Sequence, residues 1–227
     1  MAEKEKKFLR GAVVEFDFTA LDGAQILFNV AKEYLAGIGI DLTLKLEAKH
    51  LVGGNYHGGM VELFSALGNR HEPAKAAREL SNAFKDAISE RFQEGVTDGF
   101  KAFVNELKAH CVKVVISTRG DVEKLKATLG DLLGDLCVVH QETSTTYGNC
   151  KWDAWKRSCG PYDLHEMLTV GVAGSGAGVK SALIAGLSAI GIVHPHTAYQ
   201  DFGGADVVAE GFDASLAKTA LRMLHMD

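Results

Sequence analysis

Apolar and polar positions along the chain form short apolar runs and longer patterns of helical period. The segment 12–19 is mostly apolar and predicts a largely buried strand that directs the carboxylate of Asp17 out of its C-terminal end. From about residue 21 to residue 92, apolar residues recur at spacings of three and four, with glycines between the patterns and no convincing alternating strand. This pattern predicts an all-helical insert of roughly 70 residues.

Beyond Gly95, helical patterns alternate with short apolar runs. Helices are expected at 99–110, 122–129, 152–157, 179–187 and 214–225. Strands are expected at 112–116, 136–140, 168–172 and 189–193, with a further edge strand at 206–208. The alternation is typical of βαβ units and a parallel sheet. We therefore expect an α/β fold: a Rossmann-like parallel core formed by residues 1–20 and 96–227, with a helical cap domain inserted at 21–95.

Composition narrows the class of protein. A chain of 227 residues with 47% hydrophobic content can bury one substantial core and a smaller module. The net charge is −5 and no basic cluster stands out, so nucleic acid is not an expected partner. No apolar stretch approaches the ~20 residues of a membrane span, and the amino terminus has no signal-like run. We expect a cytoplasmic monomer or homodimer without membrane contact.

The four cysteines show no metal-ligand spacing and no Cys-x-x-Cys pair. Cys111 and Cys137 lie beside apolar, strand-like runs, and Cys150 and Cys159 are isolated. Free buried thiols in a reducing compartment are the simplest interpretation.

Asp17 is the first candidate for chemistry. Ligands of open α/β sheets lie beyond the carboxyl ends of the strands, so an acid at the end of the first strand marks a candidate active site. The sequence Phe16-Asp17-Phe18-Thr19 resembles, in degenerate form, the opening motif of haloacid dehalogenase-like (HAD) hydrolases, whose phosphatases carry Asp-x-Asp there. The resemblance spans nearly the whole chain and extends to members with a helical cap, such as phosphoglycolate phosphatase and β-phosphoglucomutase. It implies that Asp17 is the nucleophile and that Thr19 occupies the acid/base position.

The second predicted strand ends in Ser117, Thr118 and Arg119. The resemblance implies that Ser117 hydrogen-bonds the transferring phosphoryl group, and we assign Thr118 and Arg119 to substrate binding. The alternative is that the two hydroxyls cap the following helix, a role that Asp121 could also fill. Lys151 falls where the family has a lysine that neutralises the nucleophile and the phosphate, although Trp rather than the usual Pro follows it.

A glycine-rich segment follows the strand expected at 168–172. Its tail, 178–186, resembles a family loop and helix in which Gly-x-x-Ala-Ala-x-x-Ala-Gly is frequent. Ala173 and Gly174 then stand where the family has the acids that bind magnesium. Mg²⁺ requires oxygen ligands, so the resemblance implies Mg²⁺ as a cofactor, whereas these residues predict weak binding at best. Asp17 would be the one obligate carboxylate, joined at most by a main-chain carbonyl and by Ser175 or Asp201.

The glycine segment allows three other interpretations. Successive N–H groups at Ser175 and Gly176 could bind a phosphate or carboxylate without any metal. A P-loop is disfavoured because Val179 separates the last glycine from Lys180. A dinucleotide-binding turn is disfavoured because no acidic residue follows the next expected strand.

Residues of the insert are candidates for substrate specificity. The resemblance places Asn55, Tyr56 and His57 in the cap loop that contacts substrate. His194 and His196 flank a proline, which indicates a loop after a strand rather than a metal pair. Trp152 and Trp155 are expected to be packing or interface residues rather than a stacking platform.

Two functions therefore stay open. The first is a HAD-like hydrolase that acts on a small phosphorylated metabolite through Asp17. It would be weak or inactive as a Mg²⁺-dependent phosphatase, because a missing acid/base alone costs on the order of 10²–10⁴ in rate and the metal-binding acids are missing as well. The second is a non-catalytic HAD-fold protein that binds a small phosphate or carboxylate ligand. A dehalogenase would attack through the same Asp without metal, but this sequence lacks the halide-binding features of that branch.

Overall fold

A six-stranded parallel sheet forms the centre of the protein, as the computed structural model shows for residues 9–51, 56–142 and 151–226. The strand order is β3-β2-β1-β4-β5-β6, and every neighbouring pair is parallel. The strands are β1 (Leu9–Glu15), β2 (Lys113–Thr118), β3 (Cys137–Gln141), β4 (Leu164–Ala173), β5 (Ser188–Ile192) and β6 (Val207–Ala209). The chain adds strands first on one side of β1 and then on the other. The edge beyond β1 and β4 is therefore the position where ligands bind in such sheets.

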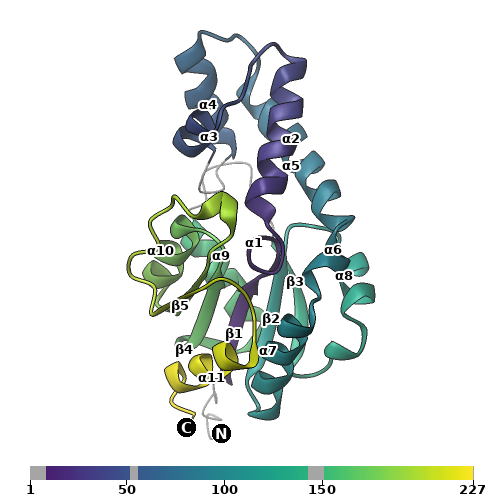
Figure 1. Ribbon diagram of the computed structural model, residues 1–227, viewed down its shortest axis with the longest axis vertical. Coiled ribbons are helices and arrows are strands. Elements are labelled where there is room, and N and C mark those ends of the chain that lie inside the picture. Colours follow the sequence, from purple (N-terminus) through teal and green to yellow (C-terminus); the bar gives the residue numbers. More distant parts are fainter. Residues whose placement is uncertain (1–8, 52–55, 143–150, 227) are drawn as a thin grey trace, which may run out of the picture.

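Helices cover both faces of the sheet (Figure 1). In chain order they are α1 (Phe16–Thr19), α2 (Gly23–Gly37), α3 (Leu44–His50), α4 (Tyr56–Leu67), α5 (Pro73–Ser89), α6 (Phe92–Gly95), α7 (Asp98–Ala109), α8 (Val122–Leu129), α9 (Lys151–Cys159), α10 (Gly176–Ala185) and α11 (Ala214–Met223). Short 3₁₀ turns η1 (Gly130–Leu132), η2 (Gly160–Tyr162) and η3 (Pro195–Thr197) connect some of them. The α/β class predicted from the alternating pattern is confirmed.

The period-two alternation of β1 divides its side chains between two cores. Ala12 and Val14 belong to the larger cluster, together with residues of α7 and α11, whereas Val13 packs with Trp155 and Val179 on the face covered by α9 and α10. Glu15, two residues after Val13, consequently points to the α9 and α10 face. This direction decides which loop its carboxylate meets.

Helices α2 to α5 form an all-helical layer beyond the carboxyl edge of the sheet (Figure 1). Helix α5 begins with Pro73 at its first turn and buries Ala77, Leu80 and Phe84, spaced by three and four residues. These side chains join the same core cluster as Leu35 of α2. The insert is helical as expected; its boundaries at residues 21 and 95 stay a prediction.

Two sequence-based details are wrong. The first strand does not extend to Thr19: β1 ends at Glu15, and Phe16–Thr19 form the single helical turn α1. Cys111 is exposed rather than buried, while Cys137 and Cys159 are buried free thiols as expected. Cys150 lies outside the described residues. No helix among the described residues is long and apolar enough to cross a membrane.

Candidate active site

The turn α1 places Asp17 against the end of β2. Asp17 is buried, and its two carboxylate oxygens accept hydrogen bonds from Thr118 Oγ1 at 2.6 Å and from the main-chain N–H of Arg119 at 2.7 Å. Burial raises the pKa of Asp17 to about 7, although both hydrogen bonds and the Arg119 charge oppose the shift. This carboxyl group can therefore hold or release a proton near neutral pH.

Thr19 does not share this environment. Its hydroxyl donates to the main-chain carbonyl of Glu15 at 2.8 Å, a bond within the turn itself. The acid closest in sequence to Asp17 at this edge is instead Glu15, the last residue of β1, which is 5% exposed and pairs in register with Ser117 of β2. The sequence-based interpretation overlooked Glu15, although an acid two residues before Asp17 repeats the acid-x-acid spacing.

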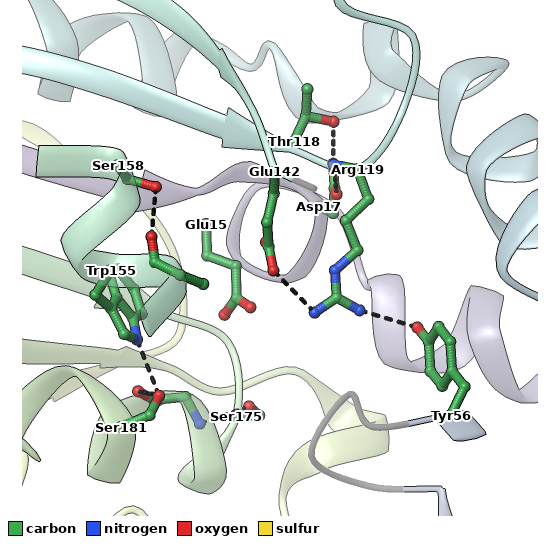
Figure 2. Close-up of polar contacts among 12 residues, drawn as sticks. Glu15, Asp17, Tyr56, Thr118, Arg119, Glu142, Trp155, Ser158, Ser175 and Ser181 are labelled. Carbon is green, nitrogen blue, oxygen red and sulfur yellow. Dashed lines mark hydrogen bonds and ion pairs between the residues drawn. The ribbon is translucent and has the colours of Figure 1, made fainter. Parts of the chain in front are cut away.

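The carboxylate of Glu15 faces the glycine segment. The N–H of Gly174 donates to Glu15 Oε2 at 3.4 Å, and a Cβ placed on Gly178 would be 3.2 Å from the same oxygen. A water-sized cavity of about 10 Å³ lies beside Glu15. Its lining includes Ser117, and also Ser158, Glu142 and Trp155, which Figure 2 labels.

Helix capping by Ser117 and Thr118 does not occur. Asp121 caps α8 by accepting from the N–H groups of Glu123 and Lys124, at 2.9 and 3.0 Å. Thr118 bonds to Asp17, and Ser117 lines the cavity beside Glu15. Both residues therefore lie at the candidate site, and phosphate binding by Ser117 and Thr118 stays a prediction.

Arg119 connects the sheet edge to the cap (Figure 2). Its guanidinium, 8% exposed, donates to the phenol oxygen of Tyr56 at 3.0 Å and to Glu142 Oε1 at 3.3 Å. The guanidinium carbon also lies 5.5 Å from the ring centre of Phe18. Burial lowers the pKa of Arg119, but Glu142, Tyr56, Glu15 and Asp17 together raise it above its ordinary value, so Arg119 stays charged.

Three main-chain donors of the glycine segment have acceptors within the protein. Besides the Gly174 bond to Glu15, the N–H of Gly176 donates to Gln200 at 3.0 Å and that of Gly178 to the N-cap hydroxyl of Ser175 at 3.0 Å. These three donors are occupied, which weakens the proposal that the segment cradles a phosphate. Substrate binding by Ser175 and Gly176 stays a prediction.

The remaining candidates are placed as follows. Tyr56 and His57 begin α4 in the cap, and Tyr56 contacts the site through Arg119. Asn55 lies outside the described residues, and so does the side chain of Lys151, whose backbone begins α9. Trp155 is buried and donates to Ser181 at 2.9 Å, as expected for a packing residue.

His194, which precedes η3, and His196 within it each contact a different element. His194 Nε2 is hydrogen-bonded to the main-chain carbonyl of Thr19 at 3.1 Å. His196 Nε2 lies 3.0 Å from the carboxylate of Glu47 in α3, and both side chains are buried. His196 thus joins the core to the cap.

The residues at this edge do not suit a divalent metal. A Cβ on Gly174 would lie 1.6 Å from the main-chain oxygen of Phe18, so no acidic side chain can stand there without moving the backbone. Ala173 carries no ligand atom, and Asp201 pairs with Lys180 at the surface, at 2.7 Å. Across residues 9–51, 56–142 and 151–226, no group of three or more His, Cys, Asp or Glu side chains could hold a metal ion.

Comparisons with known proteins agree with this architecture. No protein-family model matches the sequence, and neither does any curated protein sequence. Among solved structures, β-phosphoglucomutase from Clostridium difficile aligns with a TM-score of 0.72 and 13% identity, covering 96% of this chain and 97% of that one. CbbY from Rhodobacter sphaeroides, in complex with phosphate, aligns with a TM-score of 0.65, 17% identity and coverage of 96% and 99%.

A third neighbour is named as a HAD family hydrolase. It comes from Deinococcus radiodurans R1, holds bound phosphate and sodium, and aligns with a TM-score of 0.57, 18% identity and coverage of 96% and 97%. The chain therefore has the fold of the cap-containing HAD-like proteins. At these identities the likeness defines the fold and leaves the activity to be argued from the site.

Proposed function

We propose that this protein is a slow hydrolase of a small phosphorylated metabolite, which binds between the carboxyl edge of the sheet and the helical cap. One observation is central to the proposal. A buried carboxyl group, Asp17, is held by Thr118 and Arg119 next to a second carboxylate, Glu15, which ends β1 beside Ser117. Paired acids in different environments are the usual basis for dividing nucleophilic and proton-transfer roles.

The geometry favours a different assignment of the acids from that of the sequence motif. In the proposed scheme Glu15 attacks phosphorus and forms an acyl phosphate, while Asp17 protonates the departing oxygen. Asp17 then removes a proton from the water that hydrolyses the acyl phosphate. The raised pKa of Asp17 suits proton transfer better than attack, and Thr19 has no part in the scheme because its hydroxyl bonds within α1.

Slow turnover follows from the charges at the site. Glu15 and Glu142 are both carboxylates, and Arg119 is shared between Glu142 and Tyr56. A phosphate dianion entering this edge meets repulsion that the described cation only partly offsets. We expect turnover below the ~1 s⁻¹ that marks the lower end of typical enzymes. Lys151 stays a predicted phosphate-neutralising residue.

A second function is favoured by one specific observation. The guanidinium of Arg119 donates to both Tyr56 and Glu142, and the cavity beside Glu142 has room for about one water. A protein that binds a small anion without converting it would also have such a closed, internally bonded site. In that case the ligand displaces Tyr56 or Glu142 from Arg119.

The test is a hydrolysis assay on p-nitrophenyl phosphate and a panel of phosphorylated sugars and acids. The variants are Glu15→Gln, Asp17→Asn and, as the matched control, Thr19→Val. The proposal predicts that the first two lose activity, Asp17→Asn by on the order of 10²–10⁴, and that Thr19→Val keeps it. Loss in Thr19→Val with activity retained in Glu15→Gln would reverse the assignment. No turnover in any variant, with thermal stabilisation of the wild type by a panel member, would favour the binding protein.

A further inference from the structure

Thr118 ends β2 with a hydroxyl group that makes two hydrogen bonds. The hydroxyl donates to Asp17 Oδ1 at 2.6 Å, and its oxygen accepts from the main-chain N–H of Gly120 at 2.9 Å. Thr118 is fully buried, so bulk water does not reach this group. A hydroxyl has one proton to donate, and here Asp17 receives it. The Thr118 hydroxyl is therefore committed to Asp17 rather than presented to a ligand.

The turn that follows Thr118 is held in place by α5 and α6. The N–H of Asp121 donates at 2.8 Å to the hydroxyl of Ser89, the last residue of α5. A Cβ on Gly120 would collide with the ring of Phe92 in α6, so the turn and this helix approach as closely as glycine allows. This packing fixes the N–H of Gly120, and with it the direction of the Thr118 hydroxyl.

Two donors converge on the carboxyl group of Asp17, as Figure 2 shows for Thr118 and Arg119. The main-chain N–H of Arg119, 2.7 Å from Oδ2, donates and accepts no hydrogen bond. Thr118 could accept the carboxyl proton only if its own proton turned away into the interior, and a buried donor without an acceptor is costly. When Asp17 is protonated, its proton therefore lies on a lone pair that faces neither group.

We propose that Thr118 is a positioning residue for proton transfer by Asp17: its hydroxyl orients the carboxyl group so that the proton is free to pass to the departing oxygen of the substrate. In this step the O–H bond of Asp17 breaks and an O–H bond to the leaving oxygen forms, while Thr118 keeps its own proton. The inference rests on the proposed function. It assigns Thr118 to the orientation of the acid, in place of the phosphate binding expected from the sequence.

The experiment compares phenyl phosphate with p-nitrophenyl phosphate as substrates of the wild type, Thr118→Val and Thr118→Ser. Phenolate is a much poorer leaving group than p-nitrophenolate, so its departure depends more strongly on a correctly placed acid. We expect Thr118→Val to lower kcat/KM by about 10²-fold for phenyl phosphate and by about tenfold or less for p-nitrophenyl phosphate. Thr118→Ser keeps the hydroxyl and should restore most of the activity on both substrates.

Two controls separate orientation of the acid from ligand binding and from general destabilisation. In Thr118→Val the inhibition constant of inorganic phosphate should stay within about twofold of the wild-type value, whereas a lost bond to a charged ligand would raise it about tenfold or more. The matched variant is Thr169→Val, because Thr169 is also buried and its hydroxyl donates to the main-chain carbonyl of His165 at 2.8 Å. Thr169→Val should match the wild type on both substrates.

Three results would overturn the proposal: equal losses on the two substrates in Thr118→Val, no loss on either, or a tenfold rise in the inhibition constant of phosphate. If Thr118→Val does not fold, Thr118→Cys takes its place, because a thiol is only a weak donor. The same differential loss is expected of that variant.

No turnover by the wild type would refute the proposed function, and thermal unfolding would then decide the role of Thr118. The changes in melting temperature of Thr118→Val and Asp17→Ala should not be additive in the double variant, because either substitution removes the same hydrogen bond. Those of Thr169→Val and Asp17→Ala should be additive. Additivity in the first pair would overturn the assignment of Thr118 to Asp17.

Discussion

Substitution of Gly174 by alanine tests the close approach of the glycine segment to α1. A Cβ at this position would lie 1.6 Å from the main-chain oxygen of Phe18. Carbon and oxygen normally make contact at about 3.5 Å. The two backbone segments would therefore have to separate by almost 2 Å, at the place where Gly174 also donates to Glu15.

The cost follows from general values for overpacking. Inserted carbon atoms in a packed interior usually destabilise by about 1–3 kcal/mol, and more when the opposing atom belongs to the backbone. We expect about 3 kcal/mol for Gly174→Ala, which corresponds to a fall in melting temperature of about 6–12 °C for a protein of this size. The measurement is thermal or urea unfolding followed by circular dichroism.

The matched control is Gly37→Ala at the end of α2. No atom lies within 4 Å of a Cβ at this position, and alanine is the better helix former, so stability should be unchanged or slightly higher. Equal stability of Gly174→Ala and the wild type would refute the close-approach argument. It would also remove the reason for excluding an acidic residue at position 174.

Three further outcomes follow from the buried polar groups. The pKa of Asp17 in the folded state, about 7, lies above its ordinary value of 3.8, so the folded state keeps a proton that the unfolded state releases. The free energy of unfolding should therefore fall by up to about 4 kcal/mol as pH rises from about 4 to 7. Asp17→Asn should flatten that slope in urea titrations, and an unchanged slope would contradict the assignment. Glu142→Gln should cost about 3 kcal/mol, because the buried Arg119 guanidinium loses its ion pair with Glu142. Arg119→Met/Glu142→Leu should cost less than that single change, and additive losses would contradict the pairing. His196→Gln should destabilise the fold by about 1–3 kcal/mol and speed limited proteolysis of the cap, because the buried carboxylate of Glu47 loses its contact with the imidazole. As a control, substitution of the exposed His110 by Gln should change neither the stability nor the rate of proteolysis.

The pattern of apolar residues predicted the architecture because each element has a local cause. Helix α8 occupies 122–129 as expected, since Asp121 caps its start and Leu125 and Leu129 face the core. The strands of the parallel core are likewise close to the predicted ranges, because continuous burial on both faces leaves a run of apolar residues.

The site was predicted less well, and for physical reasons. Phe16 is buried in the α1 turn as it would be in a strand, so apolarity could not show that β1 ends at Glu15. Arg119 meets Tyr56 and Glu142, which are 63 and 23 residues away in sequence, and no periodic pattern connects such distant positions. The clash that keeps position 174 a glycine depends equally on a backbone approach that only the folded chain creates.

Metal-independent hydrolysis that depends on Asp17 is tested most directly by the rate of p-nitrophenyl phosphate hydrolysis near pH 7. The rate is measured for the wild type and Asp17→Asn, each in EDTA and in MgCl₂. We expect a slow wild-type rate that is the same in both solutions and that Asp17→Asn lowers by on the order of 10² or more. A wild-type rate that requires Mg²⁺, or one that Asp17→Asn leaves unchanged, would contradict this expectation.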